Sequence, residues 1–383
     1  MSAMRVVVAG AGVAGLETAL ALQALAEGLV SVELVAPETE FTYKPLAVAE
    51  PFRVGEMRRF PLERLVHAAG ATLRHGSLAS VQPEQKTVTL DGGDELSYDA
   101  LVLALGARSR AAVPGALTFR GVQDSAALTA LLGRATAGQV HKIAFVLPRG
   151  AAWPLPLYEL ALLTSEYLVS RLTRGVDIVL STPEARPLEL FGEAASAAIA
   201  ELLELRDIRV THDEHVRADA IVALPRLEGP VLPGIPQDDD HFVPTDEFGW
   251  VLGLTDVYAA GDLTQFPVKQ GGIATQQADV VAKSIAADAG APVRPVAFEP
   301  VLRGLLLTGM TPRFLRSGSG TKSSLVDTQP LWWPPAKIVG RYLTPFLAQH
   351  LGLSRESLRP PGTDAVAVDV ALDTRDHAAW SPV

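Results

Sequence analysis

The hydrophobic pattern of the first 35 residues predicts a strand, a helix and a second strand. Arg5–Ala9 is a continuous apolar run rich in Val, which is typical of a strand buried on both faces of a parallel sheet. Leu16–Ala26 is built of strong helix formers with an apolar face, and Gly28 fits the end of that helix. Ser31–Val35 is the second strand. Together they form a βαβ unit, whose crossover is expected to be right-handed.

The same alternation returns in the middle of the chain. It predicts helices at Asp124–Leu132, Leu157–Leu172 and Ala194–Leu205, and strands at Lys142–Leu147 and Val176–Leu180. Thr87–Leu90 and Leu96–Tyr98 flank a Gly-containing turn and predict a hairpin. The pattern predicts irregular structure at Phe41–Pro61 and a loop at Arg316–Ser324.

Composition narrows the classes of function. The chain has 383 residues, enough for more than one packed unit, and 48% of them are hydrophobic. Its 33 Lys and Arg against 43 Asp and Glu give a net charge of −10, so we expect no nucleic acid partner. The absence of cysteine excludes disulfides, thiolate metal sites and thiol redox chemistry, and we predict no metal site.

No targeting or spanning segment is recognisable. The residues before Val6 lack the basic and apolar regions of a secretory signal, and no apolar run approaches the ~20 residues that span a bilayer. We expect a cytoplasmic protein that is soluble or peripheral to the membrane.

A glycine-rich turn follows the first strand. Gly10 allows a tight turn, Gly12 lets the backbone approach a pyrophosphate, and Gly15 lets the helix pack closely on the strand. The turn therefore predicts a dinucleotide site, which also includes the intervening Ala11, Val13 and Ala14. No acid ends the second strand, and Glu38, three residues beyond it, is the candidate for the ribose hydroxyls; the alternative is a solvated loop carboxylate.

Two later segments resemble the motifs of FAD-dependent reductases with two dinucleotide domains. These are Asp99–Arg108, with Leu105 and Gly106, and Thr255–Asp262, with Gly261. The resemblance implies that FAD is the cofactor and that Asp262 binds its ribityl and phosphate region. It also implies that the strand before Gly261 returns to the first domain.

The sequence resembles most closely the branch of the pyridine nucleotide-disulfide oxidoreductase superfamily that holds sulfide:quinone oxidoreductases and type II NADH dehydrogenases. Phe41–Leu46 looks like the segment that passes the flavin ring, and it contributes Lys44 and Pro45. Phe266–Ala278 looks like the last motif of that branch, in which a helix begins at the flavin. The resemblance implies that four of its residues lie near the ring, namely Lys269, Gly271, Gly272 and Ile273. It also implies that Gln276 and Gln277 contribute to the acceptor pocket. Lys269 and Lys44 are the catalytic candidates, because positive charge stabilises the reduced ring. The alternative for both glutamines is an ordinary place on the helix face.

Two features depart from that branch. Its sulfide-oxidising members work through cysteines, which this chain lacks. The turn of the second βαβ unit, Val146–Glu159, keeps one glycine and gains three prolines, and Trp153 takes space that a pyrophosphate would need. We therefore place Trp153 in the substrate pocket and expect no conventional nicotinamide site.

The aromatic and basic segment Leu331–Leu347 suggests peripheral membrane contact. The alternatives are that its aromatics cover the flavin domain or form the contact of a homodimer.

These observations predict an α/β fold with two Rossmann-like dinucleotide-binding domains, the second inserted in the first, plus a C-terminal cap. The expected bounds are 1–115 and 240–295 for the FAD domain, 116–239 for the second and 296–383 for the cap. The expected function is two-electron transfer from a small reduced donor through FAD to an acceptor such as a quinone, without cysteine chemistry. Two alternatives stay open: an NAD(P)H dehydrogenase with an unconventional nicotinamide site, and a non-catalytic flavin-binding scaffold.

Overall fold

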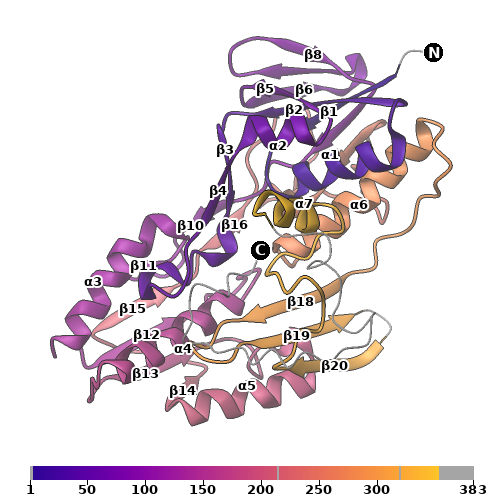
Figure 1. The fold of residues 1–383 in the computed structure, drawn as a ribbon. Helices are drawn as coiled ribbons and strands as arrows, with labels where there is room; N and C mark the ends of the chain where they lie inside the picture. The colour runs from indigo at the N-terminus through magenta and orange to yellow at the C-terminus, as the bar shows by residue number, and fades with distance from the viewer. Residues whose placement is uncertain (1–2, 214, 319–320, 353–383) are drawn as a thin grey trace, which may run out of the picture.

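A five-stranded parallel sheet forms the upper part of the molecule (Figure 1). The computed structural model describes residues 3–213, 215–318 and 321–352. The strand order is β17-β9-β1-β2-β5, and the strands are β1 (Met4–Ala9), β2 (Val30–Ala36), β5 (Thr72–His75), β9 (Ala100–Leu103) and β17 (Val257–Ala259). Helices α1 (Val13–Ala26) and α6 (Gly271–Asp288) pack against each other, and α2 (Leu62–Ala68) precedes β5. The predicted βαβ unit at the start of the chain is confirmed.

A second parallel sheet forms the lower part of the molecule. Its order is β11-β15-β12-β13-β14, and its strands are β11 (Leu117–Thr118), β12 (Lys142–Val146), β13 (Asp177–Ser181), β14 (Ile208–Thr211) and β15 (Ala220–Ala223). The helices α3 (Ser125–Thr136), α4 (Leu155–Ser170) and α5 (Glu193–Leu205) connect or flank these strands. The predicted α/β class with two Rossmann-like sheets is confirmed. All five strands lie in the chain between β9 and β17, and we propose the predicted domain bounds on that basis.

Antiparallel pairs complete the fold. The small sheets are β3 (Glu40–Tyr43) with β4 (Arg58–Pro61), β6 (Leu78–Gln82) with β7 (Thr87–Leu90) and β8 (Glu95–Ser97), and β10 (Arg108–Arg110) with β16 (Arg226–Glu228). The predicted hairpin is β7–β8. After α6 come the strands β18 (Val301–Leu306), β19 (Arg313–Gly318) and β20 (Thr321–Asp327), and then α7 (Leu343–His350).

Two local expectations are wrong. The segment Phe41–Pro61 is irregular only in its middle, because its two ends pair as β3 and β4. The predicted loop Arg316–Ser324 instead includes the end of β19 and the beginning of β20. The polar composition of that segment hid the strands, whose pairing is fixed by the neighbouring β18 and by the complete burial of Phe314 and Leu315.

The C-terminal segment packs on both halves of the molecule. Leu343 and Leu347 of α7 belong to the hydrophobic core around the first sheet, while Leu306 and Leu315 belong to the core around the second. Figure 1 shows the corresponding arrangement, with α7 beside α1 and the strands β18–β20 beside α4 and α5. Within the described ranges, none of the helices combines the length and the apolar character needed to cross a membrane.

Candidate functional site

The glycine-rich turn after β1 lies at the carboxyl edge of the first sheet. Gly10 has a φ of +108°, and a Cβ at this position would lie 2.3 Å from the carbonyl oxygen of Ala104, which follows β9. A Cβ on Gly15 would lie 1.9 Å from the carbonyl oxygen of Gly10. Both positions therefore require glycine: the first for its backbone conformation and close approach, the second because α1 packs tightly on the turn.

Gly12 stands in different surroundings. It is the N-cap of α1, no side chain caps the helix there, and the first turn holds no acidic residue. A Cβ on Gly12 would meet no atom within 4 Å. The amino end of α1 thus presents backbone N–H groups and the positive end of the helix dipole beside open space, which suits a phosphate.

The other predicted cofactor motifs meet at the same edge. Leu105 and Gly106 directly follow β9, and Gly261 follows β17 with its would-be Cβ 3.0 Å from the Cβ of Ala14. Ala11 and Val13 lie in the first turn itself, and Glu38 is exposed just after β2. In open parallel sheets, ligands bind outside the carboxyl ends of the strands, and this is the edge at which all these motifs stand.

Asp262 is half-buried beside this edge. Its carboxylate accepts no hydrogen bond from any residue in the part of the chain that the structure describes. Burial raises the pKa of Asp262, and the positive charges of Lys269 and Lys44 oppose that rise. A half-buried carboxylate without a donor is a group that a ligand hydroxyl or N–H can satisfy.

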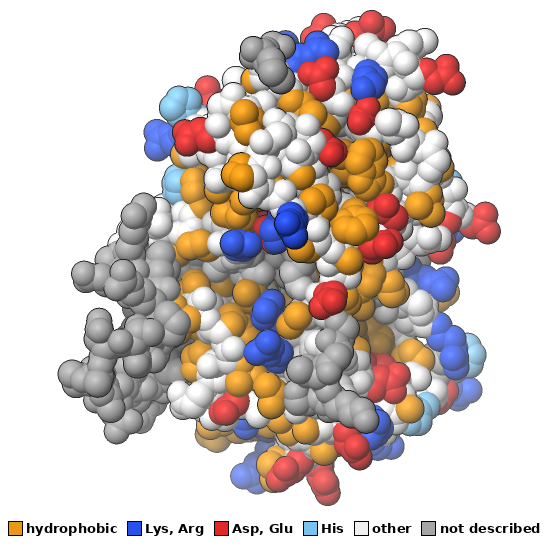
Figure 2. Space-filling model, turned by 90° about the vertical axis from the view of Figure 1, so that its right-hand side faces the viewer, with side chains coloured by type: hydrophobic (Ala, Val, Ile, Leu, Met, Phe, Trp, Pro, Cys, Tyr) orange, Lys and Arg blue, Asp and Glu red, His pale blue; other side chains and the backbone are white. Residues whose placement is uncertain are grey.

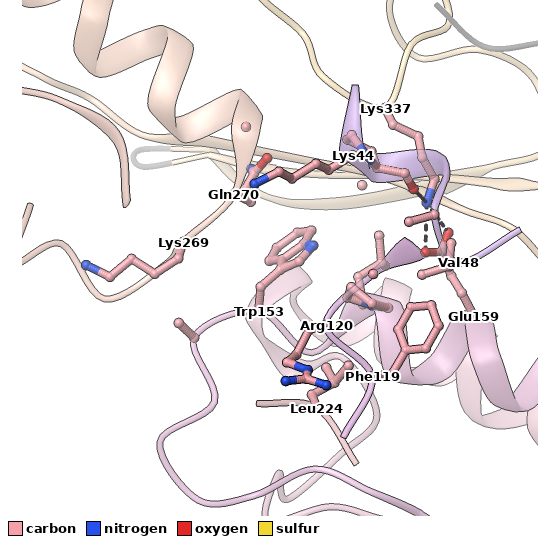
Figure 3. Close-up of a pocket in the computed structure, with 18 of the residues that line it drawn as sticks. Lys44, Val48, Phe119, Arg120, Trp153, Glu159, Leu224, Lys269, Gln270 and Lys337 are labelled. Carbon is pink, nitrogen blue, oxygen red and sulfur yellow. Dashed lines mark hydrogen bonds and ion pairs between the residues drawn. The ribbon is translucent and has the colours of Figure 1, made fainter. Parts of the chain in front are cut away.

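A cavity of about 280 Å³ lies between the two sheets and the C-terminal segment (Figure 3). Five of the predicted site residues line it: Lys44, Pro45, Trp153, Lys269 and Gly271. The backbone brings two of their segments into contact, since the N–H of Lys269 donates to the carbonyl oxygen of Ala152 at 3.4 Å. The sequence motifs at residues 44, 153 and 271 thus converge on one space.

Gln270 is a cavity residue that the sequence motifs did not single out. Its Oε1 accepts a hydrogen bond from the N–H of Gly272 at 2.7 Å, so its side chain caps α6 just before Ile273. Its Nε2 is buried and donates to no described atom. In Figure 3 the side chain of Lys44 extends toward Gln270. An unsatisfied buried donor beside an extended lysine suits a ligand that carries carbonyl or ring-nitrogen acceptors.

Glu159 and Lys337 form a buried ion pair in the cavity wall. Lys337 Nζ donates to both carboxylate oxygens of Glu159 at 2.7 Å and to the carbonyl oxygen of Pro45 at 3.2 Å. Glu159 also accepts from the N–H of Leu307 at 2.8 Å. Burial raises the pKa of Glu159, and the Lys337 ammonium opposes it. Sequence reasoning placed Lys337 in a segment that suggested membrane contact and missed its pairing with Glu159, because only the tertiary structure brings it beside α4.

Lys269 lines the cavity with its stem but directs its ammonium elsewhere. Figure 3 shows the side chain turned away from Trp153. Its Nζ donates to the carbonyl oxygen of Thr264 and lies 3.7 Å from the ring centroid of Phe242. Burial lowers the pKa of Lys269 to about 8, against the opposing effect of Asp262 and Asp238. Its predicted catalytic role stays a prediction.

The structure does not bring the two predicted glutamines into this cavity. Gln276 donates to the carbonyl oxygen of Val301 at 3.0 Å and accepts from the N–H of the same residue at 2.9 Å, which ties α6 to β18. Gln277 accepts from the N–H of Gly261 at 2.8 Å. Both amides therefore hold the backbone in place. Each side chain also lines a cavity other than this one, and their assignment to an acceptor pocket stays a prediction.

The turn of the second sheet is filled by the protein itself. Pro154 is the N-cap of α4, Pro156 occupies its first turn, and Trp153 packs edge-on against Phe191 with 5.8 Å between the ring centroids. The acid after β13, where Rossmann domains bind the ribose, is Glu184. Its carboxylate accepts a hydrogen bond from the hydroxyl of Tyr158 at 2.5 Å. Burial raises the pKa of Glu184. Prolines therefore stand at the N-cap and in the first turn of α4, and the Glu184 carboxylate is already bound by Tyr158.

The aromatic segment near the C-terminus is partly used inside the molecule. The indole N–H of Trp332 donates to the carbonyl oxygen of Ala336 at 3.0 Å, and its ring packs edge-on against the buried Phe314 at 5.1 Å. These contacts agree with the alternative that the aromatics cover the protein's own surface.

Comparison with known proteins matches the first part of the chain to the expected superfamily. The family described as pyridine nucleotide-disulphide oxidoreductase matches residues 4–144, which include β1, α1 and β9. No protein with a curated description matches the sequence. The family match relates the first part of the chain to oxidoreductases of the FAD and NAD(P) type.

Solved structures share the fold over most of the chain. The sulfide:quinone oxidoreductase from Aquifex aeolicus is similar with a TM-score of 0.74 and 18% identity, over 85% of this chain and 87% of that one. NDH2 from Plasmodium falciparum, solved with NADH, has a TM-score of 0.63 and 13% identity over 92% and 96%. A ferredoxin reductase from Rhodopseudomonas palustris has a TM-score of 0.61 and 17% identity over 82% and 83%. At these identities the comparisons establish the fold.

Proposed function

We propose that this protein is an FAD-dependent oxidoreductase that passes two electrons from a small reduced donor to an acceptor such as a quinone. The observation that carries the proposal is the convergence of the glycine motifs at the carboxyl edge of the first sheet. There the uncapped amino end of α1 at Gly12 faces open space, and Asp262 has no donor among the described residues. These groups fit a pyrophosphate and a polyol.

The cavity residues suit the redox end of the same cofactor. When bound, FAD supplies the two-electron chemistry, and the protein supplies position and charge. Gln270 Nε2 offers a donor and Lys44 a positive charge from one side of the cavity. The buried Glu159–Lys337 pair in the cavity wall can hold, at the Glu159 carboxylate, a proton that accompanies the electrons.

The filled turn of the second sheet favours a donor other than NAD(P)H. The prolines at the start of α4 remove N–H donors, and Glu184 is already bound by Tyr158. Since the chain has no cysteine, the electrons must pass directly between substrate and flavin. Small-molecule donor and acceptor, peripheral membrane contact and a homodimer all stay proposals.

Flavin retention tests the cofactor assignment. Gly12→Val and Gly133→Val form a matched pair, because a Cβ at either glycine meets no atom within 4 Å and Gly133 lies in α3, far along the chain from the motifs. We expect the wild type and Gly133→Val to purify with about one FAD per chain and Gly12→Val to fold without it, because its side chain blocks the phosphates. Flavin absorbance after denaturation measures this. A colourless wild type that takes up no added FAD, or a Gly12→Val variant with full FAD content, would refute the proposal.

Anaerobic mixing tests the donor. We expect neither NADH nor NADPH to bleach the visible flavin absorption within seconds, because the second turn is closed by Trp153 and its prolines. Rapid bleaching would establish the NAD(P)H dehydrogenase alternative. A flavin that dithionite reduces, but that no tested quinone then reoxidises, would favour the non-catalytic scaffold.

A further inference from the structure

Arg303 occupies a position shared by two cavities. It lies in the middle of β18, and it lines both the main cavity and a second cavity of about 460 Å³ between α6, β18 and the C-terminal segment. Figure 2 shows the face of the molecule on the side of α6 and β18, where Lys and Arg side chains gather near the middle among hydrophobic ones. Arg303 thus stands where the main cavity adjoins the second.

Among the described residues, the guanidinium of Arg303 has no acidic partner. It makes no hydrogen bond and no ion pair with any residue in the described ranges, although the side chain is half-buried. Its cross-strand neighbour is Arg316, a second cation. Burial and the charge of Arg316 both lower the pKa of Arg303. The acid of the second cavity, Asp279, pairs instead with Lys283 at 2.6 Å and with Arg341 at 3.8 Å.

The other cations of the main cavity mostly have partners. Among the described residues, its lining holds five basic side chains and one acid, in a chain whose net charge is −10. Lys337 pairs with Glu159, Arg120 pairs with Asp124 at 2.6 Å, and Lys269 donates to a backbone carbonyl. The side chain of Lys44 extends toward Gln270, in the part of the cavity where we predict the flavin ring. Arg303 remains as an uncompensated charge among the cavity walls.

A desolvated arginine without a counter-ion is unfavourable unless a ligand supplies the negative charge. Its planar fork matches an oxyanion such as a carboxylate with two parallel hydrogen bonds. Much of the surrounding cavity wall is apolar, with Val48, Phe119 and Leu224 among its members and Trp153 projecting into it (Figure 3). The complementary ligand has an apolar or aromatic body and one oxyanion group.

We propose that Arg303 binds the carboxylate, or an equivalent oxyanion, of a small aromatic or apolar acid that is the protein's substrate in the main cavity. This inference rests on the proposed function, since it names the class of molecule that exchanges electrons there. The body of the substrate lies against Trp153 and the apolar wall, and its charged end lies toward the second cavity. Arg303 is a binding residue and takes no part in the electron transfer.

Calorimetric titration with benzoate and its neutral isostere benzamide tests the proposal on the full chain. We expect wild type to bind benzoate at least about tenfold more tightly than benzamide, as a charge-assisted bidentate pair requires. Arg303→Met should weaken benzoate at least about tenfold and leave benzamide unchanged. Arg303→Lys should fall between the two, because lysine keeps the charge and loses the fork.

Arg316→Met is the matched control. It removes the same charge from the facing position on β19, but Arg316 is exposed and lines neither cavity. Benzoate affinity should stay within about twofold of wild type, because an exposed charge is strongly screened. Absence of benzoate binding, or equal binding by wild type and Arg303→Met, would overturn the proposal.

The flavin content of each sample separates the two proposals. A protein that holds FAD but binds benzoate independently of Arg303 would refute the oxyanion site alone. A protein that binds benzoate through Arg303 but cannot hold FAD would refute the proposed function, and with it the role of the acid as an electron-transfer substrate.

Discussion

Glu17 offers a sharp test of how the C-terminal segment is held. This residue lies in α1, directly after the glycine turn, and is fully buried. Its Oε1 accepts from the N–H of Tyr342 at 3.0 Å and its Oε2 from the N–H of Leu343 at 2.6 Å, so it caps α7 from another helix. The negative charge of Asp279 in α6 also raises the pKa of Glu17. We predict that Glu17→Gln removes a large pH dependence of stability.

The magnitude follows from the pKa of Glu17. Burial is the largest cause and raises it from 4.5 to about 7; the backbone N–H groups of 341–343 oppose the rise and Asp279 adds to it. Below pH 4.5 the carboxyl is protonated in both states. Between pH 4.5 and 7 only the unfolded state ionises, so the free energy of unfolding falls as the pH rises, and above pH 7 it levels off. The full loss is about 3 kcal/mol, at about 1.4 kcal/mol for each pKa unit.

Urea unfolding at several pH values between 5 and 8 measures the effect. Relative to Glu17→Gln, the wild type should lose about 2–3 kcal/mol of unfolding free energy across this range. Glu27→Gln is the control, because Glu27 ends the same helix, is exposed and undergoes the same chemical change. A difference between wild type and Glu17→Gln that is independent of pH would show that the carboxyl titrates normally and would refute the reasoning.

Two further outcomes are expected from charged groups of the cavity. Lys337→Met should lower the free energy of unfolding by about 3 kcal/mol, because it leaves the Glu159 charge buried and unpaired. Adding Glu159→Gln should recover much of this loss. Additive effects of the two substitutions would argue against the pair. The stability of wild type relative to Lys269→Met should rise by about 3 kcal/mol between pH 8 and 10.5, because the folded state releases the Lys269 proton near pH 8 and the unfolded state only near 10.5. Urea unfolding checks both, and parallel pH curves for wild type and Lys269→Met would contradict the second.

The first sheet and its glycine turn were predictable because their causes are local. A run of valines, a turn that needs glycine and a helix of strong formers follow one another within the reach of a sequence pattern. The structure explains why these positions are glycine, since a Cβ on Gly10 or Gly15 would collide with a carbonyl oxygen. The turn of the second sheet was predictable for the same reason, because its prolines act on the adjacent backbone.

The cavity was only partly predictable, because its remaining residues act through tertiary contacts. No local pattern links Lys337 or Arg303 to the cavity, because both lie more than 140 residues from Glu159 and from the turn at Trp153. The placement of Gln276 and Gln277 in an acceptor pocket stays a prediction: each lines a cavity other than the main one, and their amides also bind Val301 and Gly261. A side chain that can bind either a ligand or a backbone group carries no local sign of which it does.

The C-terminal segment therefore determines what the two parallel sheets can do. The fold is shared with proteins as different as a sulfide:quinone oxidoreductase and a ferredoxin reductase. In this chain β18 and the residues after it supply Arg303 and Lys337, and both face the space that Lys44 and Trp153 enter from the sheets. The same segment donates hydrogen bonds to Glu17 in α1 and to Glu159 in the cavity wall. We therefore expect a change in the charge of the cavity to alter how tightly this segment binds to the two halves of the molecule. Substrate specificity in this protein is then expected to change most readily through residues 301–338, where substitutions alter the cavity wall without disturbing the glycine turn.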